Sequence, residues 1–260
     1  MGHDILKGKV ALITGSSRGI GKSIALKFAD EGAKLVLNYS QSRSPAEEAL
    51  KDVRAHTEAI LVKADVSNPK DVERLVEAAL GEFGKIDILV NNAGIALVKP
   101  LLETGEDDWD HVIDTNLKSV FLCSKQVIPA MLKQGKGRII NLASVDSLVA
   151  EPNCSAYCAS KGGVLVLTLE MAVEFGSKNI TVNAIAPGFI NTPQNDYILK
   201  TPALLNQLIA RTPIKRVGEP SDVAEAALFF AKDETDFVTG AVVYVDGGWL
   251  AAGGNEGLQA

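Results

Sequence analysis

Cysteine and histidine are both scarce in this chain, with three of each among 260 residues. Cys123, Cys154 and Cys158 form an odd set without a C-x-x-C pair, which argues against a disulfide framework or a dithiol redox motif. The three histidines have none of the spacings that zinc sites use. The sequence therefore predicts reduced thiols and no metal centre, and it disfavours a zinc-dependent dehydrogenase.

Long apolar runs and blocks of basic residues are also missing. The longest apolar runs, such as Gly163–Leu169 and Ala241–Val245, are far shorter than the roughly 20 residues that cross a bilayer. Acidic residues outnumber basic ones, 32 against 26, and the first residues lack a signal-peptide pattern. We therefore expect a cytoplasmic protein whose partners are small molecules, and neither nucleic acid nor a membrane.

Apolar runs alternate along the chain with stretches of helical periodicity. Strands are expected at Val10–Thr14, Lys34–Tyr39, Ala59–Lys63, Ile86–Asn91, Arg138–Leu142, Thr181–Ala186 and Ala241–Val245. Helices are expected at Ile20–Asp30, Pro45–His56, Pro69–Phe83, Trp109–Leu132, Ala156–Phe175 and Ser221–Ala231. Continuous apolar strands are typical of a parallel sheet that is buried on both faces. The pattern predicts a single doubly wound α/β domain over residues 1–260, with a mobile loop and a short helix at about 188–213.

Three glycines follow the first expected strand and precede the first helix, in the order Gly15-Ser16-Ser17-Arg18-Gly19-Ile20-Gly21. Glycine lets a chain turn sharply, lets the backbone approach a pyrophosphate, and lets the helix pack closely on the strand. The helix N-terminus then offers free N–H groups and a partial positive charge to the phosphates. The turn predicts a dinucleotide site, although its spacing differs from the more common G-x-G-x-x-G.

Tyr157 and Lys161 are four residues apart in an expected helix, so they share one face. A free tyrosine has a pKa of about 10, and a nearby ammonium group stabilises the phenolate and lowers that pKa. Such a tyrosine can give a proton to a carbonyl oxygen as hydride arrives, or take one in the reverse direction. The pair alone is also explained by an aromatic ring packed beneath a lysine stem.

Taken in order, these motifs resemble the short-chain dehydrogenase/reductase family. The resemblance rests on the glycine turn, on Asn91-Asn92-Ala93-Gly94 and on Tyr157-x-x-x-Lys161, and it extends from about Lys9 to Trp249. Further positions in register are Asp65-Val66, Asn116, Ser144, Pro187-Gly188 and Asp246-Gly247-Gly248. The resemblance implies a Rossmann-type fold with a seven-stranded parallel sheet, helices on both faces, and a homotetramer.

The resemblance also implies a role for each matching residue. Tyr157 would be the proton donor beside Lys161, and Ser144 would hydrogen-bond the substrate oxygen. Asn116 would hold a water that links the lysine to solvent. Asp65 and Val66 would hold the adenine, and Ile190 and Thr192 would touch the nicotinamide amide and the phosphates. The implied dinucleotide-binding residues are Gly15, Ser17, Arg18, Gly19, Ile20, Gly21, Asn38, Tyr39, Ser40, Asp65, Val66, Asn92, Ala93, Gly94, Tyr157, Lys161, Pro187, Gly188, Ile190 and Thr192.

The second expected strand ends in Asn38-Tyr39-Ser40, without the acid that would grip the 2′-hydroxyl of NAD. Arg18 and Arg43 are cations near that position, and an arginine fork suits a phosphate dianion. We therefore expect NADP as the cofactor, while NAD, or use of both dinucleotides, stays open.

The resemblance implies that the substrate is met by three segments, Val145–Asn153, the loop Phe189–Pro213 and the tail Trp249–Ala260. They mix polar residues, such as Asp146 and Glu151, with apolar ones, such as Leu148 and Trp249, which favours a small ketone, sugar or polyol over a steroid. The alternative is a 3-oxoacyl-carrier-protein reductase, which needs basic residues near the cleft. Val173 and Gly135 stand where basic residues are common in those reductases and weaken that reading. Lys133, Lys136 and Arg138 keep it open. A non-catalytic dinucleotide-binding regulator is a remote alternative, because such proteins usually lose the tyrosine or the lysine.

Overall fold

Seven parallel strands form the centre of the protein, in the order β3-β2-β1-β4-β5-β6-β7. The strands are β1 (Val10–Ile13), β2 (Lys34–Tyr39), β3 (Ala59–Lys63), β4 (Ile88–Asn91), β5 (Gly137–Leu142), β6 (Ile180–Pro187) and β7 (Val242–Val245). The computed structural model describes residues 4–253, so His3 and residues 254–260 of the predicted substrate tail lie outside it. The predicted parallel sheet is confirmed, and each predicted strand end lies within two residues of the observed one.

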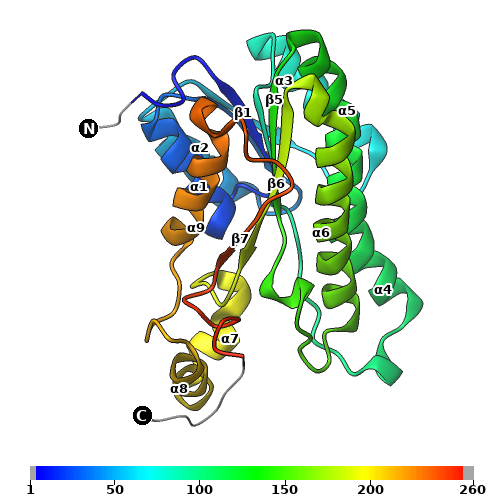
Figure 1. Cartoon of the computed structure of the whole chain (residues 1–260), viewed down its shortest axis with the longest axis vertical. Coiled ribbons are helices and arrows are strands. Elements are labelled where there is room, and N and C mark those ends of the chain that lie inside the picture. Colours follow the sequence, from blue (N-terminus) through cyan, green and yellow to red (C-terminus); the bar gives the residue numbers. More distant parts are fainter. Residues whose placement is uncertain (1–3, 254–260) are drawn as a thin grey trace.

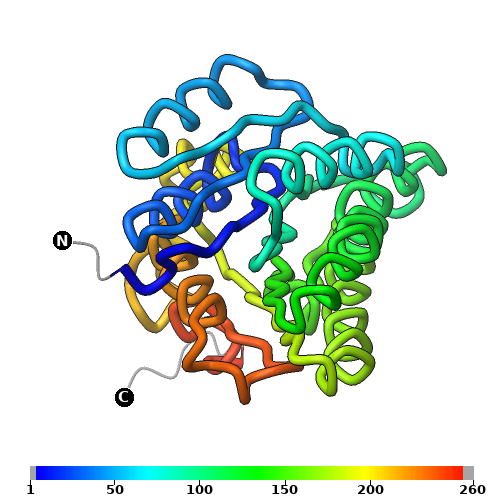
Figure 2. The backbone as a smooth tube through the Cα atoms, turned by 90° about the horizontal axis from the view of Figure 1, so that it is seen from above, coloured from blue at the N-terminus to red at the C-terminus, as the bar shows by residue number. Residues whose placement is uncertain are grey.

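Helices cover both faces of this sheet (Figure 1). They are α1 (Gly19–Asp30), α2 (Arg43–Arg54), α3 (Pro69–Phe83), α4 (Glu106–Ile113), α5 (Ser119–Gln134), α6 (Ser155–Phe175), α7 (Asp196–Leu199), α8 (Pro202–Arg211) and α9 (Pro220–Ala231). Apolar side chains of α1 and α9 pack into one core, and those of α3, α5 and α6 pack into another. Seen from above, blue α1 lies beside orange α9, with green α5 and yellow-green α6 across the sheet (Figure 2).

The chain moves away from the middle of the sheet in two opposite directions. After β1 it adds β2 and β3 on one side, and after β4 it adds β5, β6 and β7 on the other. The connections beyond β1 and β4 therefore diverge at the carboxyl ends of these strands, which is the arrangement expected to form a ligand crevice. In open parallel sheets this is the point where ligands bind.

The long helix predicted over Trp109–Leu132 is wrong in one respect, because the structure divides it. Helix α4 runs into a π-helical segment, Asp114–Lys118, and α5 follows it directly. A π-helical segment has one extra residue per turn, so it shifts the faces of the helix before and after it. Apolar periodicity does not reveal such an insertion, because each half keeps its own helical pattern.

The predicted loop at 188–213 contains more helix than expected. Helices α7 and α8 occupy much of it and lie beyond the carboxyl end of the sheet, at the bottom of Figure 1. The prolines in this stretch favoured a loop in the sequence. Pro202, however, stands at the first turn of α8, where a proline is well tolerated because its missing N–H has no helical partner.

One helical stretch in the described chain, Ser155–Lys178, is long and apolar enough to cross a membrane by length and composition alone. It contains α6, which packs its inner face against the sheet through side chains such as Val164 and Met171. A core helix of a globular protein passes the same test, so this stretch is weak evidence for a membrane span.

Candidate active site

The predicted site residues follow the carboxyl ends of five strands. Residues 15–21 follow β1, residues 65–66 follow β3, residues 92–94 follow β4, Ser144 follows β5, and residues 188–192 follow β6. Because all five strands are parallel, these segments meet at one edge of the sheet. The structure therefore brings the two halves of the predicted site, dinucleotide and catalytic, to the same end of the molecule.

The turn after β1 is too tight for side chains at two of its glycines. Gly15 has a φ of +61°, and a Cβ there would lie 2.9 Å from the Cα of Ala93. A Cβ on Gly21 would lie 2.5 Å from Nδ2 of Asn92. The turn thus packs directly on the segment after β4, and it leads into α1 with no acidic residue in the first turn of that helix. These features fit a pyrophosphate, because free backbone N–H groups and a partial positive charge face the crevice.

Asn92 and Thr14 hold the glycine turn against the segment after β4. The Asn92 side chain donates hydrogen bonds to the carbonyl oxygens of Thr14, at 2.9 Å, and of Gly15, at 3.0 Å. In return, the backbone N–H groups of Asn92 and Ala93 donate to the Thr14 hydroxyl, each at 3.0 Å. Asn92 therefore shapes the crevice by satisfying backbone groups. Thr14 belongs to the same contact, and only its place beside Gly15 in the sequence could have signalled it.

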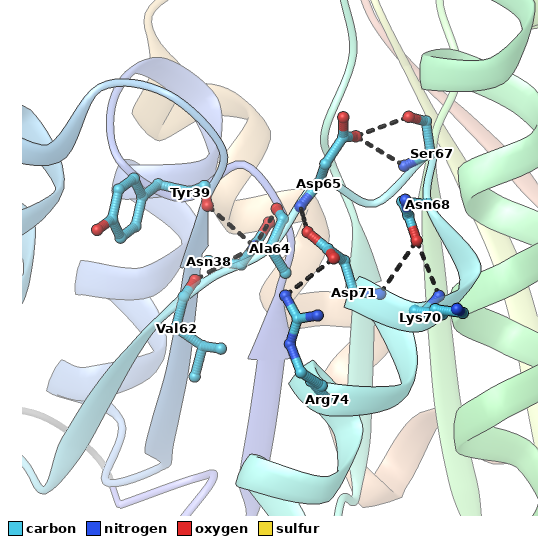
Figure 3. Close-up of polar contacts among 10 residues, drawn as sticks. All are labelled: Asn38, Tyr39, Val62, Ala64, Asp65, Ser67, Asn68, Lys70, Asp71 and Arg74. Carbon is cyan, nitrogen blue, oxygen red and sulfur yellow. Dashed lines mark hydrogen bonds and ion pairs between the residues drawn. The ribbon is translucent and has the colours of Figure 1, made fainter.

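Asn38 is buried near the carboxyl end of β2. Its Oδ1 accepts from the N–H of Gly15 at 3.1 Å, and its Nδ2 donates to the carbonyls of Ala64 at 3.0 Å and Val62 at 3.3 Å (Figure 3). The amide thus ties β1, β2 and β3 together beneath the turn. Within the described chain both polar atoms of the Asn38 side chain already form hydrogen bonds, so Asn38 shapes the dinucleotide crevice from below. Tyr39 and Ser40 follow it and are less buried.

Asp65 follows β3 and is exposed at the same edge (Figure 3). One carboxylate oxygen accepts from the backbone N–H of Ser67 at 3.0 Å and from its hydroxyl at 2.7 Å. The Asp65 backbone N–H donates to Asp71, which is also paired with Arg74. This network fixes the segment that contains Asp65 and Val66, and the second Asp65 oxygen faces no partner in the described part of the chain.

The two arginines expected near the ribose differ in their surroundings. Arg43, in the first turn of α2, donates to Glu47 at 2.7 Å and is therefore partly neutralised. Arg18 is exposed at the N-cap position of α1 and forms no ion pair within residues 4–253. Of the two, Arg18 is the cation that is free to meet a phosphate group.

The segment after β6 closes over the glycine turn. A Cβ on Gly19 would lie 3.4 Å from the Thr192 methyl group, so Thr192 stands directly over the turn. Asn191 and Ile190 pair with Gly218 in a short parallel bridge, which fixes this segment. A Cβ on Gly188 would lie 2.8 Å from Cβ of Asp246, which explains why glycine follows Pro187 there.

Ser144 and the helix that contains Tyr157 and Lys161 form the catalytic half of the site. Ser144 is the buried N-cap of a short 3-10 helix, Val145–Ser147, and its hydroxyl interacts with the Tyr157 phenol. The Lys161 ammonium lies 5.8 Å from the centre of the Tyr157 ring and donates to the Leu142 carbonyl at 2.7 Å. The predicted face shared by the tyrosine and the lysine is thus confirmed, with the serine opposite.

The expected lowering of the Tyr157 pKa is wrong for the protein alone. Burial raises the pKa of the Tyr157 phenol to about 12, and the nearby Asp146 carboxylate adds to this, while the hydrogen bond with Ser144 opposes it. Burial also lowers the pKa of Lys161 to about 8. Both shifts have the same cause, because a site that excludes water disfavours every isolated charge. Tyr157 is therefore a protonated phenol at neutral pH, ready to donate.

Asn116 lies in the π-helical segment between α4 and α5. Its Nδ2 donates to the Ile95 carbonyl at 2.9 Å and to the Ser160 hydroxyl at 3.0 Å, and its Oδ1 accepts from the Ile95 N–H at 2.8 Å. A Cβ on Gly94 would lie 3.3 Å from this Oδ1 and 3.6 Å from Nζ of Lys161. Asn116 and Lys161 therefore converge on Gly94, where the dinucleotide crevice meets the catalytic half.

Two of the three cysteines, Cys154 beside Tyr157 and Cys123 on α5, lack the surroundings of reactive thiols. Burial raises the pKa of the Cys154 thiol to about 11, and Glu151 contributes to the shift. Cys123 is fully buried, and burial raises its thiol pKa to about 12. Neither thiolate is favoured at neutral pH, which supports a packing role. In residues 4–253, no group of three or more histidine, cysteine or acidic side chains could hold a metal ion.

Two of the basic residues that kept the carrier-protein alternative open, Lys136 and Arg138, lie at the opposite end of the sheet from Ser144. Arg138 is the second residue of β5, whereas Ser144 lies beyond its last residue. Six residues of extended strand span about 20 Å. Only 3% of the Arg138 surface is exposed. Lys136 forms an ion pair with Asp233 at 2.7 Å. A partner protein at the cleft would not meet these cations.

Two residues near Ser144 were not assigned a role from the sequence. Ser147 donates its hydroxyl to the Lys161 carbonyl at 3.0 Å and so fastens the 3-10 helix to α6. Asp146 accepts from the Ser144 hydroxyl through Oδ2 at 3.3 Å, while its Oδ1 is buried without a partner in the described chain. The sequence placed Asp146 only among the polar residues of an expected substrate segment, and for Ser147 the position three residues after Ser144 was the only signal.

Known proteins resemble this chain in sequence over most of its length. The family model described as enoyl-(acyl carrier protein) reductase matches residues 15–250. A 3-oxoacyl-[acyl-carrier-protein] reductase from Synechocystis sp. is 44% identical over 94% of this chain and 98% of that protein. A protein of the same name from Staphylococcus epidermidis is 42% identical over 92% of this chain and 98% of its own length.

Solved structures also match the whole fold. A structure described as a putative gluconate dehydrogenase from Agrobacterium tumefaciens has a TM-score of 0.90 at 36% identity and covers 96% of this chain and 99% of its own. Levodione reductase has a TM-score of 0.90 at 37% identity, over 95% of this chain and 99% of that one.

Proposed function

Since the chain belongs to the short-chain dehydrogenase/reductase family and is an oxidoreductase of carbonyl and CH–OH groups, we propose that it acts on a small polar ketone and the matching alcohol, with NADP(H). The observation that supports this best is the convergence of Ser144, Tyr157 and Lys161 beside Gly94, where the dinucleotide crevice ends. The chain belongs to a family of enzymes and has both the tyrosine and the lysine, which argues against the alternative of a non-catalytic regulator.

The chain's own residues bind and protonate the substrate. A bound dihydronicotinamide supplies the hydride that reaches the carbonyl carbon. Ser144 donates a hydrogen bond to the carbonyl oxygen, and Tyr157 gives that oxygen its proton, so that a secondary alcohol forms. The Lys161 ammonium, fixed on the Leu142 carbonyl, stabilises the phenolate that remains. Asn116 holds Gly94 and Ile95 in place next to this ammonium and is proposed to connect it to solvent through a water.

Replacement of Tyr157 by phenylalanine tests this mechanism. We expect turnover to fall by about 10²- to 10⁴-fold, which is the usual contribution of general acid–base catalysis. The dissociation constant for the dinucleotide should stay within about twofold, since the phenol hydroxyl is not needed to hold the phosphates. The matched control is Tyr244→Phe on β7, which should change neither quantity. Substantial turnover in Tyr157→Phe would show that another group supplies the proton.

The preference for NADP rests on Arg18 and on the absence of an acid among residues 38–40. Changing Arg18 to alanine should weaken NADPH binding by about tenfold or more, which is the usual effect of losing a hydrogen bond to a charged group. NADH binding should hardly change. Arg43→Ala is the control with a smaller expected effect, because Arg43 is already paired with Glu47. Equal losses for NADPH and NADH, or better wild-type catalysis with NADH, would contradict the preference.

A second candidate substrate is a 3-oxoacyl thioester on a carrier protein. It is favoured by the names of the relatives that are 42% and 44% identical to this chain. It is disfavoured by the position of Lys136 and Arg138 at the far end of the sheet. Comparing kcat/KM for an acetoacetyl thioester with the values for simple ketones, sugars and polyols decides between the two candidates.

We further propose that the chain is one domain that assembles as a homotetramer in the cytoplasm, with residues 188–213 forming the substrate loop. Support for assembly comes from α6, which exposes Val166, Leu169 and Val173 along one face. Val173 alone is 86% exposed. Apolar surface of this kind is typical of a subunit contact.

A further inference from the structure

Asp146 stands two residues beyond Ser144, in the 3-10 helix that packs against α6. Its carboxylate is only partly satisfied by the protein. Oδ2 accepts from the Ser144 hydroxyl at 3.3 Å, a long and therefore weak hydrogen bond, and the buried Oδ1 has no partner in the described chain. A carboxylate can accept about four hydrogen bonds, and because Oδ1 is buried, a ligand would have to bind Oδ2.

The Ser144 hydroxyl and the Asp146 carboxylate form a donor and an acceptor side by side. The hydroxyl has a single hydrogen, and in the proposed reaction it points at the substrate's carbonyl oxygen. When it turns to that oxygen, Oδ2 of Asp146 loses the one side-chain donor that it had. A substrate that also brings a hydroxyl group would restore the lost hydrogen bond. Substrates without one would leave Oδ2 of a half-buried carboxylate without a side-chain donor, which is costly.

The distance between the two oxygens defines where that substrate hydroxyl must be. Ser144 Oγ and Asp146 Oδ2 are 3.3 Å apart. Oxygens on adjacent carbons of a substrate are separated by about as much as two hydrogen-bonded oxygens, roughly 2.8 Å. A carbonyl and a hydroxyl on neighbouring carbons therefore match the pair, with the carbonyl on Ser144 and the hydroxyl on Asp146.

We propose that Asp146 selects α-hydroxy ketones in the direction of reduction, and vicinal diols in the direction of oxidation, by accepting a hydrogen bond from the substrate hydroxyl next to the reacting carbon. This inference rests on the proposed function and names its substrate class. The other charged or titratable groups that influence Asp146 and its neighbours are Glu151, Lys161, Tyr157 and Cys154. Of these, Glu151 adds to the effect of burial in raising the pKa of the Asp146 carboxyl.

Two pairs of ketones that differ by one hydroxyl group test the inference: hydroxyacetone against acetone, and 3-hydroxy-2-butanone against 2-butanone. The measured quantity is the ratio of kcat/KM within each pair, with NADPH and the full-length enzyme. A hydroxyl group also activates a ketone chemically, so the informative result is the change in this ratio between enzyme variants. We expect Asp146→Ala to lower the ratio by about tenfold or more, and Asp146→Asn, which keeps one acceptor oxygen, to lower it less.

Glu151→Gln is the matched control, because it removes a neighbouring negative charge without touching Ser144 or Asp146. It should leave the ratio unchanged. An unchanged ratio in Asp146→Ala, or an equal fall in Glu151→Gln, would overturn the inference and leave the proposed function intact. Failure of the wild type to reduce any ketone would overturn the proposed function and this inference together.

Discussion

At the scale of single residues, burial sets the acid–base chemistry of the site. It raises the pKa of the Tyr157 phenol to about 12 and that of the Asp146 carboxyl to about 6, and it lowers the pKa of the Lys161 ammonium to about 8. Each shift favours the neutral form of its group. The phenol is thereby kept as an acid, which suits carbonyl reduction. A positively charged nicotinamide bound nearby would favour the phenolate, which suits the reverse reaction.

The Asp146 shift predicts a pH-dependent effect on stability. Its pKa in the folded protein, about 6, exceeds the ordinary value of 3.8. The stability that this group contributes is therefore complete below about pH 4 and is lost as the pH rises through 6. The asparagine in Asp146→Asn does not ionise. Its melting temperature should therefore rise relative to that of the wild type as the pH increases from 4 to 7.

Thermal unfolding of both proteins across this pH range measures the difference. The control is Glu77→Gln, at an exposed position where no ion pair forms within residues 4–253, and its difference from the wild type should be flat with pH. A flat difference for Asp146→Asn as well would mean that the carboxylate is solvated in the folded protein.

The sequence predicted Tyr157, Lys161 and Ser144 as site residues because their order and spacing resemble those of the family. It predicted the wrong direction for the shift of the Tyr157 pKa. Spacing shows which groups are near one another, while the pKa depends on how much water the fold removes from them. For the same reason the sequence placed Asp146 in an expected substrate segment but did not predict its burial, since a lone acid in a loop is usually solvated.

At the scale of elements, the turn between β1 and α1 depends on contacts from the segment after β4. Gly21→Ala should destabilise the fold by about 1–3 kcal/mol and weaken dinucleotide binding, because its Cβ would meet Asn92 Nδ2 at 2.5 Å and the Gly15 carbonyl oxygen at 2.6 Å. Chemical unfolding and a binding titration measure the two effects.

Gly81→Ala in α3 is the matched control, because a Cβ there has no neighbour within 4 Å. It should stabilise the protein by about 0.5–1 kcal/mol and leave dinucleotide binding unchanged. If Gly21→Ala behaved like Gly81→Ala, the turn would be looser than the contacts indicate.

The alternation of strands and helices was predictable because each parallel strand is a continuous apolar run. Two local features were not. The π-helical segment contains Asn116, whose side chain is hydrogen-bonded to Ile95 and Ser160, which lie 21 and 44 residues away in the sequence. Helix α8 begins at a proline, a residue that usually indicates a loop, so local preference favoured the wrong state.

At the scale of the whole molecule, α6 takes part in two functions through different faces. Its first turns contain Tyr157 and Lys161, and its later turns expose Val166 and Val173.

Val173→Asp should therefore reduce the mass of the assembly in solution, because a charge would be buried in an apolar contact. Light scattering after gel filtration measures that mass. Leu102→Asp, at a leucine that is 99% exposed elsewhere, should leave it unchanged. An unaltered mass for Val173→Asp would exclude this face of α6 as a subunit contact.

Asn38 has a consequence for the order in which the protein gains its structure. Its hydrogen bonds join Gly15, Val62 and Ala64, which lie 23 to 26 residues away along the chain. The glycine turn therefore reaches its final shape only after three separate strands have aligned, and such non-local pairing is slow. During refolding, the ability to bind a dinucleotide should appear late, after most of the helical signal has returned.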